Sequence, residues 1–275
     1  MIVSFHPLFK ADRNIICAGR EPDLSDLAAI REASAVILPQ ACPRGLYFMA
    51  SNNCPNIFPN YSARFKYPGK IGQIKLFHEK LVPHPPTATF NNLAEFRLSC
   101  PCPQTLKLPL VLKLDWGGEG DTVFLVRSAH QLNELLANAA RYEASGQSGF
   151  LLQHYIPSNN RSLRVVIIGD EITSYWRQRE DPNGFHASLS KGAKLDVCAD
   201  PELKEAAEKL VADFCRRAGI NLAGLDVIFA ENETHPRPLL LEINYFFGRV
   251  GLGGSEKYYR TLKKAIRRWL KRINL

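Results

Sequence analysis

Two apolar segments late in the chain, GLDVIFA and PLLLEIN, are separated by the short polar run ENETHPR. Segments arranged in this way predict the two strands of a β-hairpin centred near residue 235. This hairpin restricts the fold most, because it requires an antiparallel strand pair with polar side chains on one face. In its register Asp226 lies opposite Glu242 or Asn244, and side chains two residues apart on a strand share a face.

The polar side chains of this hairpin allow two interpretations. Glu242 and Asn244 alone are typical of a polar fringe at a sheet edge. Together with Asp226 they supply only oxygen ligands, which suits Mg²⁺ or Mn²⁺ bound with a phosphate substrate. A buried pair of carboxylates without a cation is costly, so the complete set favours a metal site.

A second hairpin is predicted in RSLRVVIIGDEITSYWRQR, with Gly169-Asp170 as its two-residue turn. This turn places Arg164 opposite Tyr175 and Ser162 opposite Arg177. The two arginines therefore lie diagonally together on one face, where their guanidinium groups repel each other unless an anion lies between them. Two explanations remain open, namely pairing with carboxylates of the same fold or a site for a phosphate or a substrate carboxylate.

A lysine and a glycine-rich loop follow each other in PLVLKLDWGGEGDT. Lys113 lies inside an apolar strand-like run, and Gly117, Gly118 and Gly120 allow backbone N–H groups to approach an anion. An ordinary tight turn is the alternative interpretation. The chain contains neither GxxxxGK[ST] nor GxGxxG, so nothing supports a P-loop or a dinucleotide fingerprint.

The remaining pattern indicates an α+β organisation with a small α/β unit at the start. Residues 15–60 alternate between strand-like and helical segments: NIICAG, DLSDLAAIREA, SAVILPQ, RGLYFMASNN and CPNIFPN. A boundary is expected near residue 65, and a helix begins at Lys70 and ends before VPHPPT. A later helix has Asp200 as its N-cap and Gly219 after its end.

The basic character of the chain is concentrated at its C-terminus. The net charge is +8, but residues 256–275 hold eight Lys/Arg and one Glu, which leaves only +1 for all other residues. Apolar residues recur there at helical spacing: Tyr259, Leu262, Ile266, Trp269, Leu270 and Ile273. One interpretation is a closing helix with a solvated basic face, and the other is contact with an acidic partner, RNA or a membrane surface.

Composition suggests a reducing environment. The apolar fraction of 45% is typical of an ordinary globular protein, and seven cysteines are an odd number for a disulfide framework. MIVSFHPLFKADRN lacks the pattern of a signal peptide, and no apolar run approaches the length of a membrane span, so we expect a cytoplasmic protein. Cys100 and Cys102 form the one close cysteine pair, which fits a plain loop better than a metal site.

An ordered set of residues resembles the ATP-grasp superfamily, and most closely its RimK-type carboxylate–amine ligases. The set is Lys70, Lys113 with its glycine loop, Arg164, Arg177, Asp226, Glu242 and Asn244. The resemblance covers roughly residues 66–255 and implies an ATP-grasp fold of two α+β lobes that grip ATP. It implies these bounds: a small domain 1–65, an ATP-grasp domain 66–275, lobes 66–152 and 153–255, and a terminal helix 256–275.

The resemblance also implies a role for each residue of the set. Lys70 and Lys113 would approach the ATP phosphates, together with the glycine loop and Ser188. The adenine hinge would be Gln153, His154, Tyr155 and Ile156, and the metal ligands would be Asp226, Glu242 and Asn244. Three positions depart from the family pattern: Thr122 in the loop, Ser162 where an acidic residue is usual, and Ser188 where an asparagine is usual.

The function implied is an ATP- and Mg²⁺-dependent ligase that activates a carboxylate as an acyl phosphate and transfers it to an amine. Arg164 and Arg177 would be its catalytic arginines, acting on a small-molecule or peptide carboxylate. One alternative is a phosphotransferase with the same fold that does not ligate. Another is a non-catalytic nucleotide-binding module whose basic helix contacts RNA or membrane. The sequence does not define the acid, the amine or the oligomeric state.

Overall fold

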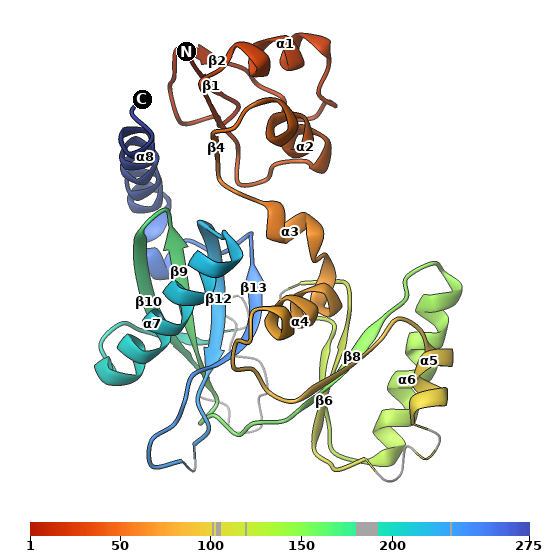
Figure 1. The fold of residues 1–275 in the computed structure, drawn as a ribbon. Helices are drawn as coiled ribbons and strands as arrows, with labels where there is room; N and C mark the ends of the chain where they lie inside the picture. The colour runs from red at the N-terminus through yellow and green to blue at the C-terminus, as the bar shows by residue number, and fades with distance from the viewer. Residues whose placement is uncertain (101, 103–105, 119, 180–191, 232) are drawn as a thin grey trace.

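The computed structural model describes residues 1–100, 102, 106–118, 120–179, 192–231 and 233–275. Within these residues the chain forms three β-sheets with helices packed around them (Figure 1). One sheet lies in the N-terminal part of the chain, and the other two form the body of the molecule below it. The C-terminal helix returns to the N-terminal sheet, so the two chain ends lie near each other (Figure 1).

The N-terminal sheet has the strand order β2-β1-β3-β4, and all of its strands are parallel. Its elements are β1 (Ile2–Ser4), β2 (Arg13–Asn14), α1 (Leu24–Glu32), β3 (Ala35–Ile37), α2 (Arg44–Asn53), β4 (Ile57–Phe58) and α3 (Ser62–Lys66). The predicted helices and the last two strands are present. The strand predicted from NIICAG is wrong, because the chain leaves the sheet after Asn14 and exposes Ile16, and β1 takes the central place instead.

A second sheet, sheet B, has the order β5-β8-β6-β7 and is antiparallel. Its elements are β5 (Thr87–Phe90), α5 (Leu93–Ser99), β6 (Leu110–Leu114), β7 (Val123–Val126), α6 (Ala129–Ala144) and β8 (Phe150–His154). Phe90, Phe96 and Phe150 pack together in its core with ring centroids 5.2 to 5.6 Å apart. This core anchors α5 and α6 on one face and leaves the other face for the rest of the molecule.

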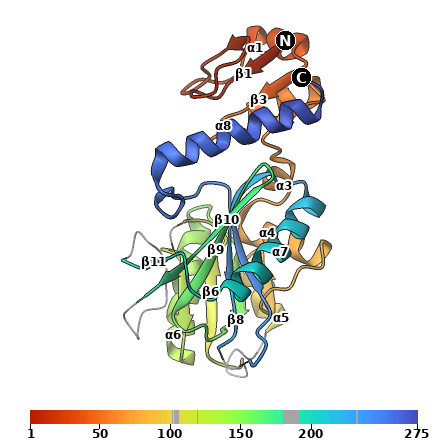
Figure 2. The same ribbon diagram turned by 90° about the vertical axis from the view of Figure 1, so that its left-hand side faces the viewer.

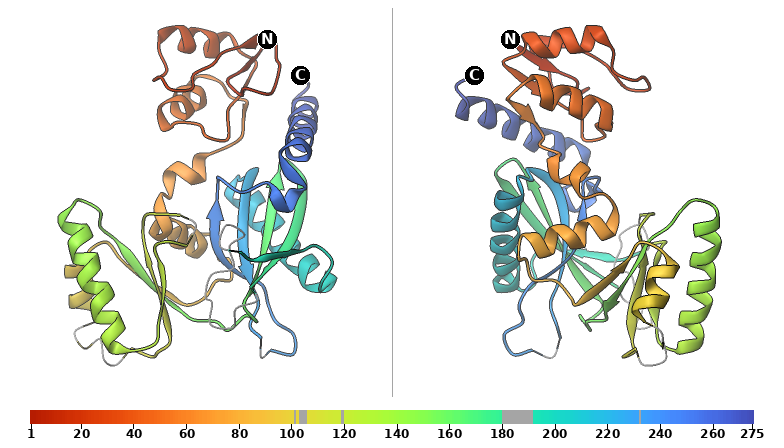
Figure 3. Two further views of the ribbon diagram at one scale, coloured as in Figure 1. Left: turned by 180° about the vertical axis from the view of Figure 1, so that it is seen from behind. Right: turned by 45° about the vertical axis from the view of Figure 1, so that its right-hand side comes forward.

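The third sheet, sheet C, has the order β11-β10-β9-β12-β13. Its elements are β9 (Arg161–Ile168), β10 (Glu171–Gln178), β11 (Lys194–Asp196), α7 (Pro201–Ala218), β12 (Leu222–Ile228) and β13 (Leu239–Asn244). Helix α4 (Gly69–Glu79) lies between sheets B and C (Figure 3). Asp200 is the N-cap residue of α7 as predicted, but its carboxylate makes no cap hydrogen bond because it pairs with Arg161.

Both predicted hairpins are present, the first in the predicted register and the second in one of the two registers that the sequence allowed. In the first, Arg164 pairs with Tyr175 and Ser162 with Arg177. In the second, Asp226 pairs with Glu242, and a β-bulge follows between Asp226 and Val227. Bulges change the direction in which neighbouring side chains point, and they are common beside functional sites.

The C-terminal helix α8 (Gly254–Arg272) joins the N-terminal sheet to sheet C (Figure 2). Its buried side chains share a core with residues of both sheets: Tyr258, Leu262, Ala265, Ile266 and Leu270. The predicted apolar stripe included Tyr259, but this side chain is only half-buried, and its neighbour Tyr258 is the buried one. Arg268 pairs with both Asp170 and Glu171 in the β9–β10 turn, so part of the basic face is neutralised within the fold. This packing confirms the closing helix.

Two further sequence expectations concern thiols and membranes. Among the described residues, which include all seven cysteines, no disulfide is formed, and four of the cysteines are buried. Among the described residues no helix combines the length and the apolar character that crossing a membrane requires.

Candidate active site

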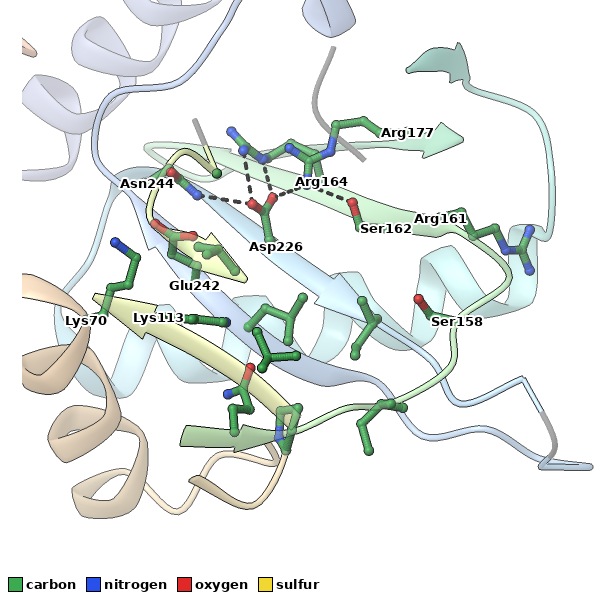
Figure 4. Close-up of a pocket in the computed structure, with 18 of the residues that line it drawn as sticks. Lys70, Lys113, Ser158, Arg161, Ser162, Arg164, Arg177, Asp226, Glu242 and Asn244 are labelled. Atoms are coloured by element: carbon green, nitrogen blue, oxygen red, sulfur yellow. Dashed lines mark hydrogen bonds and ion pairs between the residues drawn. The ribbon is translucent and has the colours of Figure 1, made fainter. Parts of the chain in front are cut away.

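Sheets B and C enclose a cavity of about 350 Å³, shown in close-up in Figure 4. Most of the predicted site residues line it: Lys70, Lys113, Gly118, Gly120, Gln153, His154, Tyr155, Ile156, Arg164, Arg177, Asp226, Glu242 and Asn244. Gly117 does not line the cavity, and Ser188 lies outside the described residues. Residues that are up to 174 positions apart in the sequence, such as Lys70 and Asn244, therefore meet at one site.

Lys70 reaches the cavity from the first turn of α4. Its ammonium group donates hydrogen bonds to the carbonyl oxygens of Trp116, at 3.1 Å, and Gly117, at 3.3 Å. The helix start is fixed by Asp115, whose Oδ1 accepts a hydrogen bond from the backbone N–H of Ile71 at 2.7 Å. Burial lowers the pKa of Lys70 below its usual value. The segment that directly follows β6 thus positions the lysine of a neighbouring helix.

The glycine loop is shaped by Gly117 and closed by Thr122. Gly117 has a φ of +82°, and a Cβ there would lie 2.5 Å from Cγ2 of Thr122, so only glycine fits. Thr122 donates a hydrogen bond through its hydroxyl to the carbonyl of Trp116 at 2.7 Å. At Gly118, apart from its chain neighbours, no atom of the described residues lies within 4 Å of the place that a Cβ would occupy. The threonine that departs from the family pattern therefore stabilises the loop and leaves the backbone at Gly118 open.

Lys113 projects from β6 into the cavity. Its side chain is buried and, within the described part of the chain, forms no hydrogen bond or ion pair. Burial lowers its pKa to about 8, although the nearby Glu242 opposes this shift. A buried lysine without a partner is costly, and an anion in the cavity would relieve that cost.

The predicted hinge runs from β8 toward sheet C. The Gln153 side chain is buried and donates to the hydroxyl oxygen of Thr87 at 2.9 Å. The backbone N–H of His154 donates to the carbonyl of Pro86 at 2.9 Å, which keeps this strand end in sheet B. Tyr155 and Ile156 follow the end of β8 and line the cavity. The hinge segment therefore connects the two sheets at the cavity wall.

Asp226 lies between the two predicted arginines (Figure 4). Its Oδ1 accepts from Nε of Arg164 at 2.5 Å and lies 2.7 Å from Nη2 of Arg177, and its Oδ2 accepts from Nδ2 of Asn244 at 3.3 Å. Burial opposes ionisation of Asp226, but the two guanidinium groups outweigh it and lower its pKa. Arg177 also donates to Oγ of Ser162 at 2.8 Å. Of the two explanations for the arginine pair, a carboxylate of the same fold is the one observed.

Glu242 faces the same cavity without such partners. Among the described residues its carboxylate forms no hydrogen bond or ion pair, and burial together with the charge of Asp226 raises its pKa. The free-energy cost of ionising two adjacent buried carboxylates is therefore seen at Glu242, because two arginines already neutralise the charge of Asp226. In the described residues no group of three or more His, Cys, Asp or Glu side chains could hold a metal ion. Any cation here would use Glu242 and Asp226 together with the Asn244 carboxamide.

Comparison with known proteins identifies the family. A family model described as the RimK-like ATP-grasp domain matches residues 74–269, which is more than half of the chain. The chain belongs to the RimK-like ATP-grasp family. The predicted resemblance is confirmed, and the cavity lies where the two sheets of this RimK-like domain face each other.

Curated relatives of the RimK-like chain carry ligase or synthase names. A probable alpha-L-glutamate ligase from Citrobacter koseri is 30% identical over 151 residues, covering 54% of this chain and 45% of the relative. Beta-citrylglutamate synthase B from Danio rerio is 28% identical over 148 residues, covering 54% and 35%. The ribosomal protein bS6–L-glutamate ligase of Escherichia fergusonii is 28% identical over 150 residues, covering 54% and 45%. The chain thus spans less than half the length of these relatives.

Solved structures show the same fold. A RimK-domain ATP-grasp protein from Sphaerobacter thermophilus superposes with a TM-score of 0.61 at 14% identity, over 96% of this chain and 98% of that one. A D-alanine–D-alanine ligase from Bacillus anthracis complexed with ATP gives 0.62 at 15% identity, over 96% and 87%. The predicted ATP-grasp fold is therefore confirmed.

Two residues with clear contacts to the site escaped the sequence analysis of this RimK-like chain. Asp115, described above, directly follows the strand that carries Lys113, and that position was its one available signal. Gln73 lies one turn after Lys70 in α4, and its carboxamide bonds to the backbone of Ile243 in β13. No pattern in the sequence connects a helix glutamine with a strand about 170 residues later.

Proposed function

We propose that the protein is an ATP- and Mg²⁺-dependent ligase that joins a carboxylate to an amine through an acyl phosphate. The observation that carries this proposal is the cavity itself, in an ATP-grasp fold. Lys113 of one sheet and Glu242 of the other both line it, and neither forms a hydrogen bond or ion pair with another described residue. The ligase and synthase names of the relatives support the reaction class.

The described residues fit a nucleotide. Lys70 and Lys113 supply positive charge in a buried setting, where attraction to phosphate oxygens is stronger than in water. The open backbone at Gly118 suits close approach of an anion. Gln153 to Ile156 would hold the adenine through their backbone groups, at the wall between the sheets.

The carboxylates and the carboxamide fit a hard divalent cation. Glu242, Asp226 and Asn244 offer the oxygen donors that Mg²⁺ prefers, and burial together with the charge of Asp226 raises the pKa of Glu242, a cost that a bound cation would reduce. When bound, Mg²⁺ would neutralise charge on the transferred phosphoryl group. Asp226 would then exchange part of its contact with the arginines for the metal.

Arg164 and Arg177 would hold the carboxylate substrate beside the phosphates. Arg177 has a buried Nε without a hydrogen-bond partner among the described residues, so it retains a donor for a further anion. In the reaction a substrate carboxylate oxygen bonds to the γ-phosphorus, and the bond from that phosphorus to the bridging oxygen of ADP breaks. The amine nitrogen then attacks the acyl carbon, the bond from that carbon to the phosphate oxygen breaks, and the nitrogen loses a proton to the departing phosphate or to water, which forms the amide. The guanidinium groups would stabilise the negative charge at both steps.

The test is ADP release by the full chain with ATP and Mg²⁺, supplied with pooled carboxylic acids and pooled amines. L-Glutamate is the first amine to examine, because two relatives are named glutamate ligases. The proposal predicts ADP release that requires both pools and falls by at least about a hundredfold in Lys113→Met, since a buried charge contact to phosphate is lost. Release that depends on one pool alone, with a phosphorylated product and no amide, would instead assign the phosphotransferase alternative.

A further inference from the structure

The outer edge of β13 is covered by a side chain of α4. Gln73 donates through Nε2 to the carbonyl oxygen of Ile243 at 3.0 Å, and its Oε1 accepts from the backbone N–H of Ile243 at 2.8 Å. A carboxamide carries the same donor and acceptor as a peptide group, so Gln73 pairs with Ile243 as a neighbouring strand would. β13 is the last strand of sheet C in the described chain, and at Ile243 its outer edge would otherwise lack a partner among the described residues.

Ile243 stands between the two candidate metal ligands of β13. Glu242 precedes it and Asn244 follows it, so holding the backbone of Ile243 in place also restrains the Cα positions from which both side chains project. At this point β13 is held less regularly by its neighbour β12, because the bulge between Asp226 and Val227 interrupts their pairing just before Glu242. A second contact to the backbone of β13 therefore matters most here. On the same edge, the N–H of Leu240 donates a hydrogen bond to the carbonyl of Pro83 at 2.8 Å.

Helix α4 also carries Lys70, one turn before Gln73. Residues three apart in a helix share a face, and Lys70 is bonded to the glycine loop of sheet B while Gln73 is bonded to sheet C. One helix face therefore sets the separation between the loop and the strand that holds Glu242 and Asn244. Lys70, Gln73 and Glu242 also line one small cavity, so these side chains lie near each other.

We propose that Gln73 is a positioning residue that holds Glu242 and Asn244 in the geometry needed for divalent metal binding beside a nucleotide. This inference rests on the proposed function. Gln73 itself touches neither metal nor nucleotide, and it acts through the backbone of β13.

The experiment measures two affinities for Gln73→Met, a substitution of similar length that removes both hydrogen bonds. The first is Mn²⁺ binding in the presence of saturating ADP, followed by electron paramagnetic resonance, and the second is ADP binding in EDTA. Loss of a group that orients metal ligands typically costs about 10–100-fold in metal affinity, and we expect a loss in this range. ADP affinity in EDTA should stay within about twofold, because Lys70 and Lys113 are untouched.

Asn14→Leu is the matched control. The Asn14 carboxamide makes the same pair of bonds with the backbone of Ala11, at 2.9 Å and 3.1 Å, far from the cavity in the N-terminal sheet. Its Mn²⁺ and ADP affinities should equal those of the unaltered protein. Urea unfolding of both variants checks that each is folded.

The outcomes separate the two proposals. If the unaltered protein binds neither Mn²⁺ nor ADP, the proposed function fails and the role of Gln73 fails with it. If the unaltered protein binds both and Gln73→Met behaves like Asn14→Leu, only the role of Gln73 is wrong. If Gln73→Met loses ADP affinity in EDTA as strongly as Mn²⁺ affinity, Gln73 merely supports α4 and Lys70, and the positioning role is also overturned.

Discussion

Asp226 and Glu242 lie opposite each other on β12 and β13, but their carboxylates have different neighbours. Asp226 is held by two arginines, which lower its pKa despite burial. Glu242 has no such partner among the described residues, and its pKa is raised by burial and by Asp226. Removing the charge should therefore destabilise the fold at one position and stabilise it at the other.

The first prediction compares Glu242→Gln with Asp226→Asn. The raised pKa of Glu242 gives stability that is present below the unfolded-state pKa and lost as pH rises through the folded-state pKa, so at neutral pH the ionised group destabilises the fold. Glu242→Gln should raise the free energy of unfolding at pH 7. Asp226→Asn should lower it by about 3–5 kcal/mol, because it leaves two buried arginines without a charge partner. Urea unfolding measures both, and a shift in the same direction would contradict this account of the site.

The second prediction concerns Lys113, whose pKa burial lowers to about 8. Because the folded-state value lies below the unfolded one, the lysine is partly neutral near pH 8, and bound phosphates would restore its charge. ADP binding at pH 8 should therefore take up protons, and affinity should fall as pH rises further. Calorimetry in two buffers of different ionisation enthalpy measures this uptake. Lys113→Arg remains protonated throughout, so an equal uptake in that variant would show that Lys113 is not the group that titrates.

At the level of elements, local signals predicted the two hairpins correctly. The Gly169-Asp170 turn fixes the register of β9 and β10, since a two-residue turn leaves one pairing for all later residues. Short elements such as β1, α3 and β11 were missed, because their few residues form a strand or helix only through neighbours distant in sequence. The bulge beside Asp226 could not be predicted either. Pairing Asp226 with Glu242 and pairing it with Asn244 place the same apolar residues on the same faces of the hairpin, so the sequence did not distinguish the two registers.

The third prediction concerns α8, which shares its core with the N-terminal sheet and sheet C. Ile266 is 1% exposed in this core, so Ile266→Ala should lower the free energy of unfolding by about 2–5 kcal/mol. Ile16 is 76% exposed, and Ile16→Ala should change the free energy of unfolding by less than about 0.5 kcal/mol. Urea unfolding compares the pair, and equal effects would mean that α8 contributes little to joining the sheets.

For the whole molecule, the sequence predicted which residues meet but not how they are paired. The order of Lys70, Lys113, Arg164, Arg177 and the candidate metal ligands of β12 and β13 was enough to recognise the fold. Their pairing depends on three-dimensional distances. For this reason the sequence could not decide whether Arg164 and Arg177 pair with a carboxylate of the fold, as they do with Asp226, or with a bound anion. The bond between Gln73 and Ile243 joins residues 170 positions apart, and no local pattern encodes it.

The site draws its charges from two sheets, so each sheet should affect nucleotide binding in its own way. The positive groups Lys70 and Lys113 belong to sheet B and its neighbouring helix, and the candidate metal ligands belong to sheet C. A nucleotide with its metal would connect the two and favour closure of the cavity.

The most direct measurement is ADP binding by calorimetry, with Mg²⁺ and with EDTA, for the unaltered protein and for Glu242→Gln. The account predicts that the unaltered protein binds ADP more tightly with Mg²⁺, and that Glu242→Gln keeps the binding in EDTA but loses the gain from Mg²⁺. It would be contradicted by a protein that binds ADP in neither condition, or by a Glu242→Gln variant that keeps the full gain from Mg²⁺.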